Sequence, residues 1–177
     1  MLTQFLKRLL SAFSRSPETD SHGSSQASGE AQAATRPAPL GYVYPGGNVA
    51  RYVFNDRHLF KDGRPKAGAF QPELHPELKR YEVSVCGLQN VSADRMWELG
   101  RTIRAREGIA AVAAVEVPVT HIIAVGLACE PAPEPDFIEH GVVLGWNPDP
   151  EAKSARLDAQ NALVASLPPT AVLRPPP

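Results

Sequence analysis

Residues 79–88 read KRYEVSVCGL, and from Tyr81 to Cys86 larger apolar side chains alternate with polar or small ones. Successive side chains of a β-strand point to opposite faces of its sheet, so this alternation is typical of a strand. Tyr81, Val83 and Val85 would then share one face. The stretch predicts a strand with one apolar side.

A second strand is predicted upstream, at residues 49–55. Its sequence, VARYVFN, is rich in the β-branched and aromatic side chains that favour extended backbone. Residues 56–77 separate the two strands and contain three prolines and a Lys-Asp-Gly turn signal, so any pairing inside them must be brief. We interpret this segment as a long loop with the potential to carry function.

The downstream elements complete the predicted domain. Ser92 is a suitable N-cap for a helix that runs to Arg106 and is ended by Gly108; its buried stripe would be Met96, Leu99, Gly100 and Ile103. Residues 109–117, IAAVAAVEV, fit either a strand or a helix. Residues 121–130, HIIAVGLACE, are apolar on both faces and predict a central, buried strand.

The last two predicted elements are a short strand at residues 140–146, HGVVLGW, and a helix from Asp149-Pro150 to about Leu167. The order of strands and helices predicts an α+β fold. We expect one small domain with a mixed or antiparallel sheet of four to five strands and two packed helices.

Residues 1–15 predict an amphipathic helix ahead of the domain. Its large apolar side chains recur at steps of three and four: Leu2, Phe5, Leu6, Leu9, Leu10 and Phe13. Lys7 and Arg8 interrupt the apolar run, which argues against a secretory signal. So short a helix is marginal alone in water, so it would dock on a membrane surface, on a partner protein or on its own domain.

The chain divides into four predicted parts. Residues 16–40 follow the helix and are predicted as a disordered linker, because residues 16–39 contain no large apolar or aromatic side chain. Residues 41–167 form the globular domain. Residues 168–177, PPTAVLRPPP, predict an extended tail without regular structure.

Composition excludes several classes of protein. The 18 basic and 19 acidic side chains give a net charge of -1, so nucleic acid is not expected as a partner. No apolar run approaches the roughly 20 residues that span a bilayer. Cys86 and Cys129 are too few for a disulfide scaffold. We predict a cytoplasmic protein that can attach peripherally to the inner face of the membrane through its N-terminal helix.

A basic cluster is the first candidate site. Arg51, Arg64 and Lys66 could bind a phosphate or carboxylate, and His58 could transfer a proton near neutral pH. The alternative is that these charges are simply solvated and that the stem of Arg51 packs along its strand.

His140 is the second candidate acid or base. Strand parity over residues 140–146 would place it on the same face as Trp146, which would then form a pocket wall. The alternative is a half-buried histidine bound to a nearby carbonyl. For His121 we expect a place in the core, because its predicted strand face is apolar.

No motif predicts a metal or a cofactor. The five histidines show no HxxxH or HExxH spacing, and the chain contains no dinucleotide-binding glycine pattern, Walker A loop or G-x-S-x-G. Cys86 precedes Gly87 at a predicted strand end, where a turn could expose it as a nucleophile. Free cysteines are nevertheless mostly buried and structural.

Six short motifs stand out along the chain: RYVF (51–54), His58, KAGAFQP (66–72), YEVSVCGL (81–88), Trp97 and HGVVLGW (140–146). Together they resemble a pattern found in small uncharacterised bacterial proteins, a domain of unknown function. The resemblance covers about residues 49–165. It implies a single bacterial domain and transfers no catalytic role.

The sequence supports two hypotheses on function. The first is a non-catalytic accessory or interaction domain, docked to a membrane surface or protein partner through its N-terminal helix. The sequence does not distinguish this hypothesis from a component of a bacterial defence or toxin operon. The second is a small enzyme for a phosphorylated or anionic substrate, in which Arg51 and Lys66 bind charge and His58 or His140 is the acid or base. The second hypothesis predicts that Arg51, His58 and His140 line one concave pocket.

Overall fold

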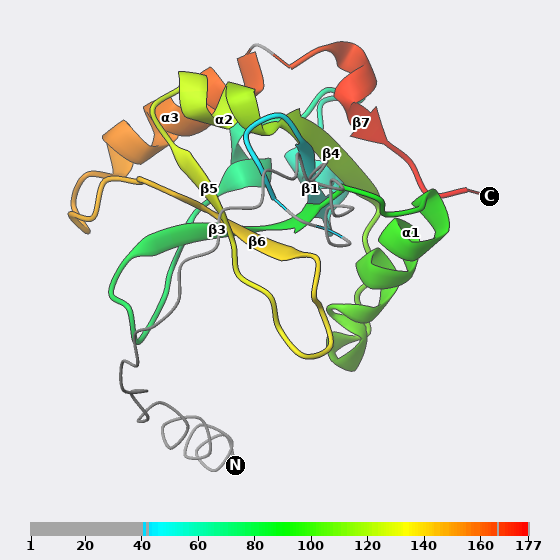
Figure 1. The fold of residues 1–177 in the computed structure, drawn as a ribbon. Helices are drawn as coiled ribbons and strands as arrows, with labels where there is room; N and C mark the ends of the chain where they lie inside the picture. The colour runs from blue at the N-terminus through cyan, green and yellow to red at the C-terminus, as the bar shows by residue number, and fades with distance from the viewer. Residues whose placement is uncertain (1–40, 42, 166, 177) are drawn as a thin grey trace, which may run out of the picture. The chain divides into compact units, whose positions relative to one another are not determined.

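The computed structural model describes residues 41, 43–165 and 167–176, which form an α+β domain around one antiparallel sheet (Figure 1). Within them the strand order is β5-β6-β3-β1-β4-β7, and β2 pairs with β3. The strands are β1 (Asn48–Val53), β2 (Glu73–Leu74), β3 (Tyr81–Gly87), β4 (Ala113–Pro118), β5 (Ala128–Pro131), β6 (His140–Leu144) and β7 (Val172–Leu173). The predicted fold class is confirmed, with more strands than expected. The predicted N-terminal helix and linker lie outside the described residues.

Helices cover both faces of the sheet. The described helices are α1 (Ala93–Thr102), α2 (Val119–Ala124) and α3 (Lys153–Ala165), with the short 3-10 helices η2 (Asp56–His58), η3 (Ala67–Phe70), η4 (Ala105–Glu107) and η5 (Pro169–Ala171). In Figure 1, α2 and α3 lie above the sheet, and α1 lies on the other side. Ile122 and Leu163 join the larger core on the first face, whereas Trp97 and Leu99 of α1 join a smaller core. None of the helices in the described ranges is long and apolar enough to cross a membrane.

The strand predicted at residues 79–88 lies inside the sheet as β3. Val83 and Val85 face the larger core, and Cys86 faces the smaller one. The predicted helix also forms behind its predicted cap, because Ser92 Oγ accepts a hydrogen bond from Arg95 N at 3.2 Å. The alternation of apolar side chains in β3 and the N-cap at Ser92 were therefore sufficient to predict the inner strand β3 and the first helix, α1.

The central strand predicted at residues 121–130 is wrong. The first residues of the segment instead form the last part of helix α2, and the chain then turns at Gly126 with φ +82°. It continues as β5, a mostly exposed strand at one edge of the sheet. Val119 and Ile122, one helical turn apart, are buried, whereas Ile123 is 49% exposed. A helix of six residues is too short for its apolar spacing to be told from a buried strand.

The extended tail predicted at residues 168–177 is also wrong in part. Residues Pro169–Ala171 form η5, and Val172 and Leu173 pair with Val115 and Ala114 as the strand β7. The prolines of this segment precede and follow the two paired residues, so the strand keeps its backbone donors. The folded domain therefore continues past Leu167.

Strand β1 is paired unevenly along its two edges. Six consecutive residues, Asn48–Val53, pair with β4, but only Val49 and Ala50 pair with β3. Farther along β3, Glu82 and Tyr81 pair instead with β2. The ladder between β1 and β3 is thus interrupted in the middle of the sheet. We call the gap between Arg51–Val53 and Val83–Val85 the sheet window.

Candidate functional site

Arg51 occupies the sheet window. Its Nε donates a hydrogen bond to Ala69 O of η3 at 3.1 Å, and its Nη1 donates to Ser84 O of β3 at 3.0 Å. The guanidinium therefore joins η3 to β3 where strand pairing is missing. Its Nη2 has no hydrogen-bond partner among the described residues, and Arg51 makes no direct ion pair with any described carboxylate. One edge of this cation is free to meet a ligand.

Burial lowers the pKa of the Arg51 guanidinium from its ordinary value, and the charge of Arg104 lowers it further. The carboxylate of Glu73 acts in the opposite direction. Arginine stays protonated under these conditions, so the structure holds a partly desolvated positive charge. An anion placed beside it would relieve that cost.

Arg51 lines three neighbouring cavities in the described part of the chain. The largest has a volume of about 400 Å³ and holds the charged or titratable side chains of Arg51, Arg57, His58, Glu73 and Arg104. We call it the basic cavity, because three guanidinium groups face one carboxylate. A second cavity, of about 190 Å³, holds Glu73, His75 and Glu82.

The third cavity has a volume of about 150 Å³ and a different lining. Besides Arg51, its walls include Tyr52, Phe54, Ile103, Phe137 and His140. We call it the aromatic cavity. Arg51, Tyr52 and Phe54 line it together with the basic cavity, so the two cavities are neighbours around these residues.

His58 lines the basic cavity together with Arg51. Arg57 Nε donates to His58 Nε2 at 3.3 Å, which leaves Nδ1 as the protonated nitrogen of a neutral ring. Burial lowers the pKa of His58, and the charges of Arg57 and Arg51 lower it further, against a backbone hydrogen bond at Gly68. At neutral pH this side chain is a hydrogen-bond acceptor, not a cation.

Arg64 and Lys66 do not line the basic cavity. Arg64 pairs with Asp62 at 2.9 Å, and Lys66 Nζ donates to Arg57 O at 2.9 Å. Both cations lie over the ring of Phe60, at 5.6 and 5.4 Å from its centroid. The structure therefore does not bring these two residues into one cavity with Arg51, although the charge of Lys66 still contributes to the lowered pKa of His58.

Two arginines that the sequence did not single out take their place. Arg57 is adjacent to His58, and its position in the same loop was a usable signal. Arg104 follows α1 and lies over the ring of Phe54 at 5.3 Å, while pairing with Glu107. Only the fold brings Arg104 to the cavity, so no local pattern could have identified it.

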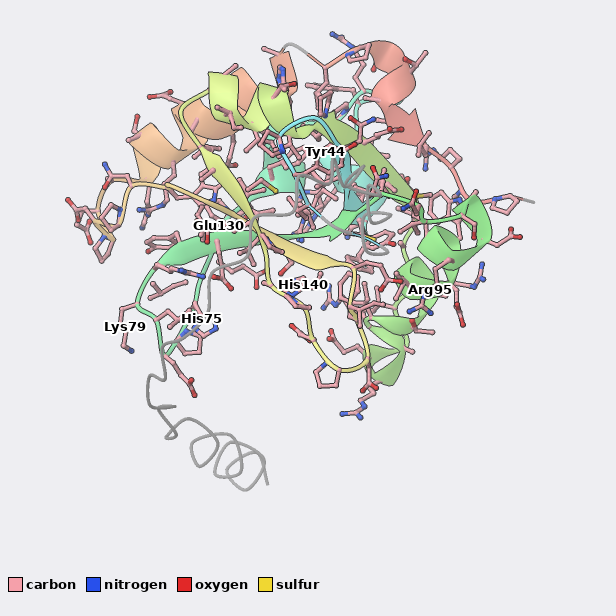
Figure 2. The ribbon with its side chains drawn as sticks, in the orientation of Figure 1. Tyr44, His75, Lys79, Arg95, Glu130 and His140 are labelled. Carbon is pink, nitrogen blue, oxygen red and sulfur yellow. The ribbon has the colours of Figure 1, made fainter. Side chains whose placement is uncertain are left out.

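His140 lies at the start of β6, on the α1 side of the sheet (Figure 2). Its Nδ1 lies 2.8 Å from Ala132 O and 3.1 Å from a carboxylate oxygen of Glu134, and its ring stacks on Phe137 at 5.1 Å. His140 and Arg51 line the aromatic cavity, whereas His58 lines the basic one. The expected single pocket containing both histidines is not formed.

Trp146 does not share a face with His140, so that prediction is wrong. The strand β6 ends at Leu144, and Gly145, with φ +91°, turns the chain before Trp146. The indole is buried in the larger core, and its Nε1 donates to Val143 O at 2.9 Å. Trp146 therefore packs on the face opposite to the aromatic cavity.

The remaining candidate residues, His121, Cys86 and Cys129, have the environments of structural side chains. His121 Nε2 lies 3.1 Å from Leu163 O, which links α2 to α3. Burial raises the pKa of Cys86 to about 11 and that of Cys129 to about 12, so both thiols stay protonated near neutral pH. Among the described residues, no cluster of His, Cys, Asp and Glu could hold a metal ion.

Comparison with known proteins adds no relative. No family model matches the chain, and neither the curated proteins nor the solved structures contain a match. The resemblance to a domain of unknown function stays a prediction.

Proposed function

We propose that this protein is a non-catalytic accessory domain that binds an anionic group of its ligand or partner in the basic cavity. The environment of the Arg51 guanidinium is the main support for this proposal. This guanidinium is partly buried, held by two carbonyl oxygens and by no carboxylate, in a cavity that it shares with Arg57 and Arg104.

The anion best suited to this cavity is a phosphate. Its oxygens can accept hydrogen bonds from the free edge of Arg51 and from either neighbouring guanidinium at once. Hydrogen bonds to charged groups stabilise a complex by about 1.5–3 kcal/mol each. Two or three such bonds would give binding strong enough to measure for a small anion.

Isothermal titration of the full chain with inorganic phosphate tests this proposal. We expect saturable binding that Arg51→Met weakens at least tenfold. Arg64→Met is the matched control, because Arg64 carries the same charge on a neighbouring loop but lies outside the cavity, paired with Asp62. Absence of phosphate binding, or equal losses in the two variants, would overturn the proposal.

The N-terminal segment supplies the second part of the proposed function. The apolar stripe of residues 1–15 supports docking to a membrane surface or a partner, and hence a cytoplasmic protein with peripheral attachment. Co-sedimentation with anionic vesicles, with and without residues 2–15, tests the lipid version. Equal partitioning of the two chains would exclude it.

One observation favours the alternative, a small enzyme for a phosphorylated substrate. His58, a neutral base, shares the basic cavity with Arg51. Incubation with an aryl phosphate ester tests it, and turnover that His58→Gln abolishes would establish it. The binding proposal expects no turnover in either protein.

A further inference from the structure

We propose that the ligand is a pyrimidine mononucleotide, with its phosphate in the basic cavity and its base in the aromatic cavity. This inference rests on the proposed function, because it takes the anion site at Arg51 as its starting point. It adds the chemical class of the ligand and its orientation, with the phosphate in one cavity and the base in the other.

The two cavities adjoin each other. Arg51, Tyr52 and Phe54 line both of them, so a ligand bound at the free edge of Arg51 lies beside the aromatic cavity. A lone phosphate would use only one of the two spaces. The arrangement suits a molecule in which an anionic group and a ring are joined by a short spacer.

The aromatic cavity has the shape of a site for a flat ring. Tyr52 and Phe54 form one tilted pair of rings, with centroids 6.4 Å apart, and Phe137 and His140 form a stacked pair. All four line the same cavity, together with Ile103. Aromatic walls bind the flat faces of bases by stacking. A volume of about 150 Å³ suits a single six-membered ring.

The aromatic cavity also has polar groups at its rim. Glu134, which contacts His140 Nδ1, is an acceptor at the rim of the aromatic cavity, and Ser84 adds a hydroxyl. A pyrimidine base presents N–H or amino donors and carbonyl acceptors along its edge, which a phenyl ring lacks. The carboxylate of Glu134 also repels an anion from this cavity. Charge therefore assigns the phosphate to the three arginines and the base to the aromatic walls.

Titration calorimetry of the full chain with CMP, UMP, AMP, GMP and ribose 5-phosphate tests the inference. Ribose 5-phosphate is the matched control, because it has the sugar and the phosphate without a base. We expect CMP or UMP to bind about tenfold more tightly than ribose 5-phosphate and no less tightly than the purine nucleotides.

Two variants locate the base. Phe137→Ala and Ile103→Ala each remove a wall of the aromatic cavity. Ile103 is 42% exposed, so we expect its replacement to cost little stability. Both should reduce the preference for CMP or UMP over ribose 5-phosphate to less than about threefold, with the affinity for ribose 5-phosphate unchanged.

The outcomes separate the inference from the proposed function. If ribose 5-phosphate binds and no pyrimidine nucleotide binds more tightly, or if purine nucleotides bind best, the inference is overturned and the anion site stands. A preference that persists in both wall variants also overturns it. If neither ribose 5-phosphate nor inorganic phosphate binds, both proposals fail.

Discussion

The two edges of β1 differ sharply in how far they are paired. Toward β4, Asn48–Val53 pair without interruption, and Val115 and Val117 are completely buried. Toward β3, pairing stops after Ala50, and the guanidinium of Arg51 spans the gap. Beyond Ala50, therefore, β1 is joined to β4 by backbone hydrogen bonds and to β3 by a side chain.

This difference shows how a binding site can arise inside a sheet. A continuous ladder leaves no backbone group and no space for a ligand. An interrupted ladder leaves a carbonyl such as Ser84 O in need of a donor. Arg51 satisfies it, together with Ala69 O of η3, and keeps a further N–H edge. The same residue then stabilises the fold and presents a charge to a ligand. Substitutions at the sheet window should therefore change both stability and binding, whereas substitutions at the β4 edge should change stability alone.

Substitution of Phe70 should produce the largest effect. Phe70 is fully buried in η3, directly after Ala69, whose carbonyl holds Arg51. We expect Phe70→Ala to lower the free energy of unfolding by about 3–5 kcal/mol in urea titrations. The milder Phe70→Leu keeps the chain folded, and it should weaken phosphate binding because η3 shifts.

Val117→Ala is the control on the closed edge of β1. Removal of two methyl-sized groups from the core should cost about 2 kcal/mol of stability. Phosphate affinity should stay at the wild-type value, because Val117 lies away from the sheet window. Equal phosphate affinity in Phe70→Leu and Val117→Ala would show that the window does not depend on η3.

Arg51→Met should have an intermediate effect on stability. The substitution leaves Ala69 O and Ser84 O without their donor, which we expect to cost about 2 kcal/mol. Hydrogen exchange should accelerate in β3 and remain unchanged in β4. Uniform acceleration across both strands would contradict the idea that Arg51 replaces only the missing part of the ladder.

Much of the fold was predictable because its elements have local signals. The alternation at Tyr81–Val85 and the cap at Ser92 depend only on neighbouring residues, and both predictions are confirmed. The central strand expected at residues 121–130 failed because helix α2 is shorter than two full turns of apolar spacing. Strand β7 escaped prediction because its pairing with β4 joins residues far apart in the sequence.

The candidate site was only partly predictable. Arg51 and His58 lie in one cavity, as their closeness in sequence suggested, but Arg104 reaches it from the end of α1. Arg64 and Lys66 belong to the same loop as His58, yet Arg64 pairs with Asp62 and Lys66 donates to Arg57 O. The interruption of the ladder has no sequence signature, so nothing in the chain alone marked Arg51 as the centre of the site.

The pH dependence of His58 should give the smallest effect and the sharpest test of the basic cavity. Its pKa in the folded protein lies below the ordinary value of 6.5, so the unfolded chain takes up this proton first as pH falls. Stability should therefore decline as pH decreases from 6.5 to the lowered pKa, and His58→Gln should remove that decline. Sulfate affinity should rise over the same interval, because protonated His58 adds a cation. His75 lines the second cavity and not the basic one, so His75→Gln should retain both trends, and their loss there would contradict the assignment to His58.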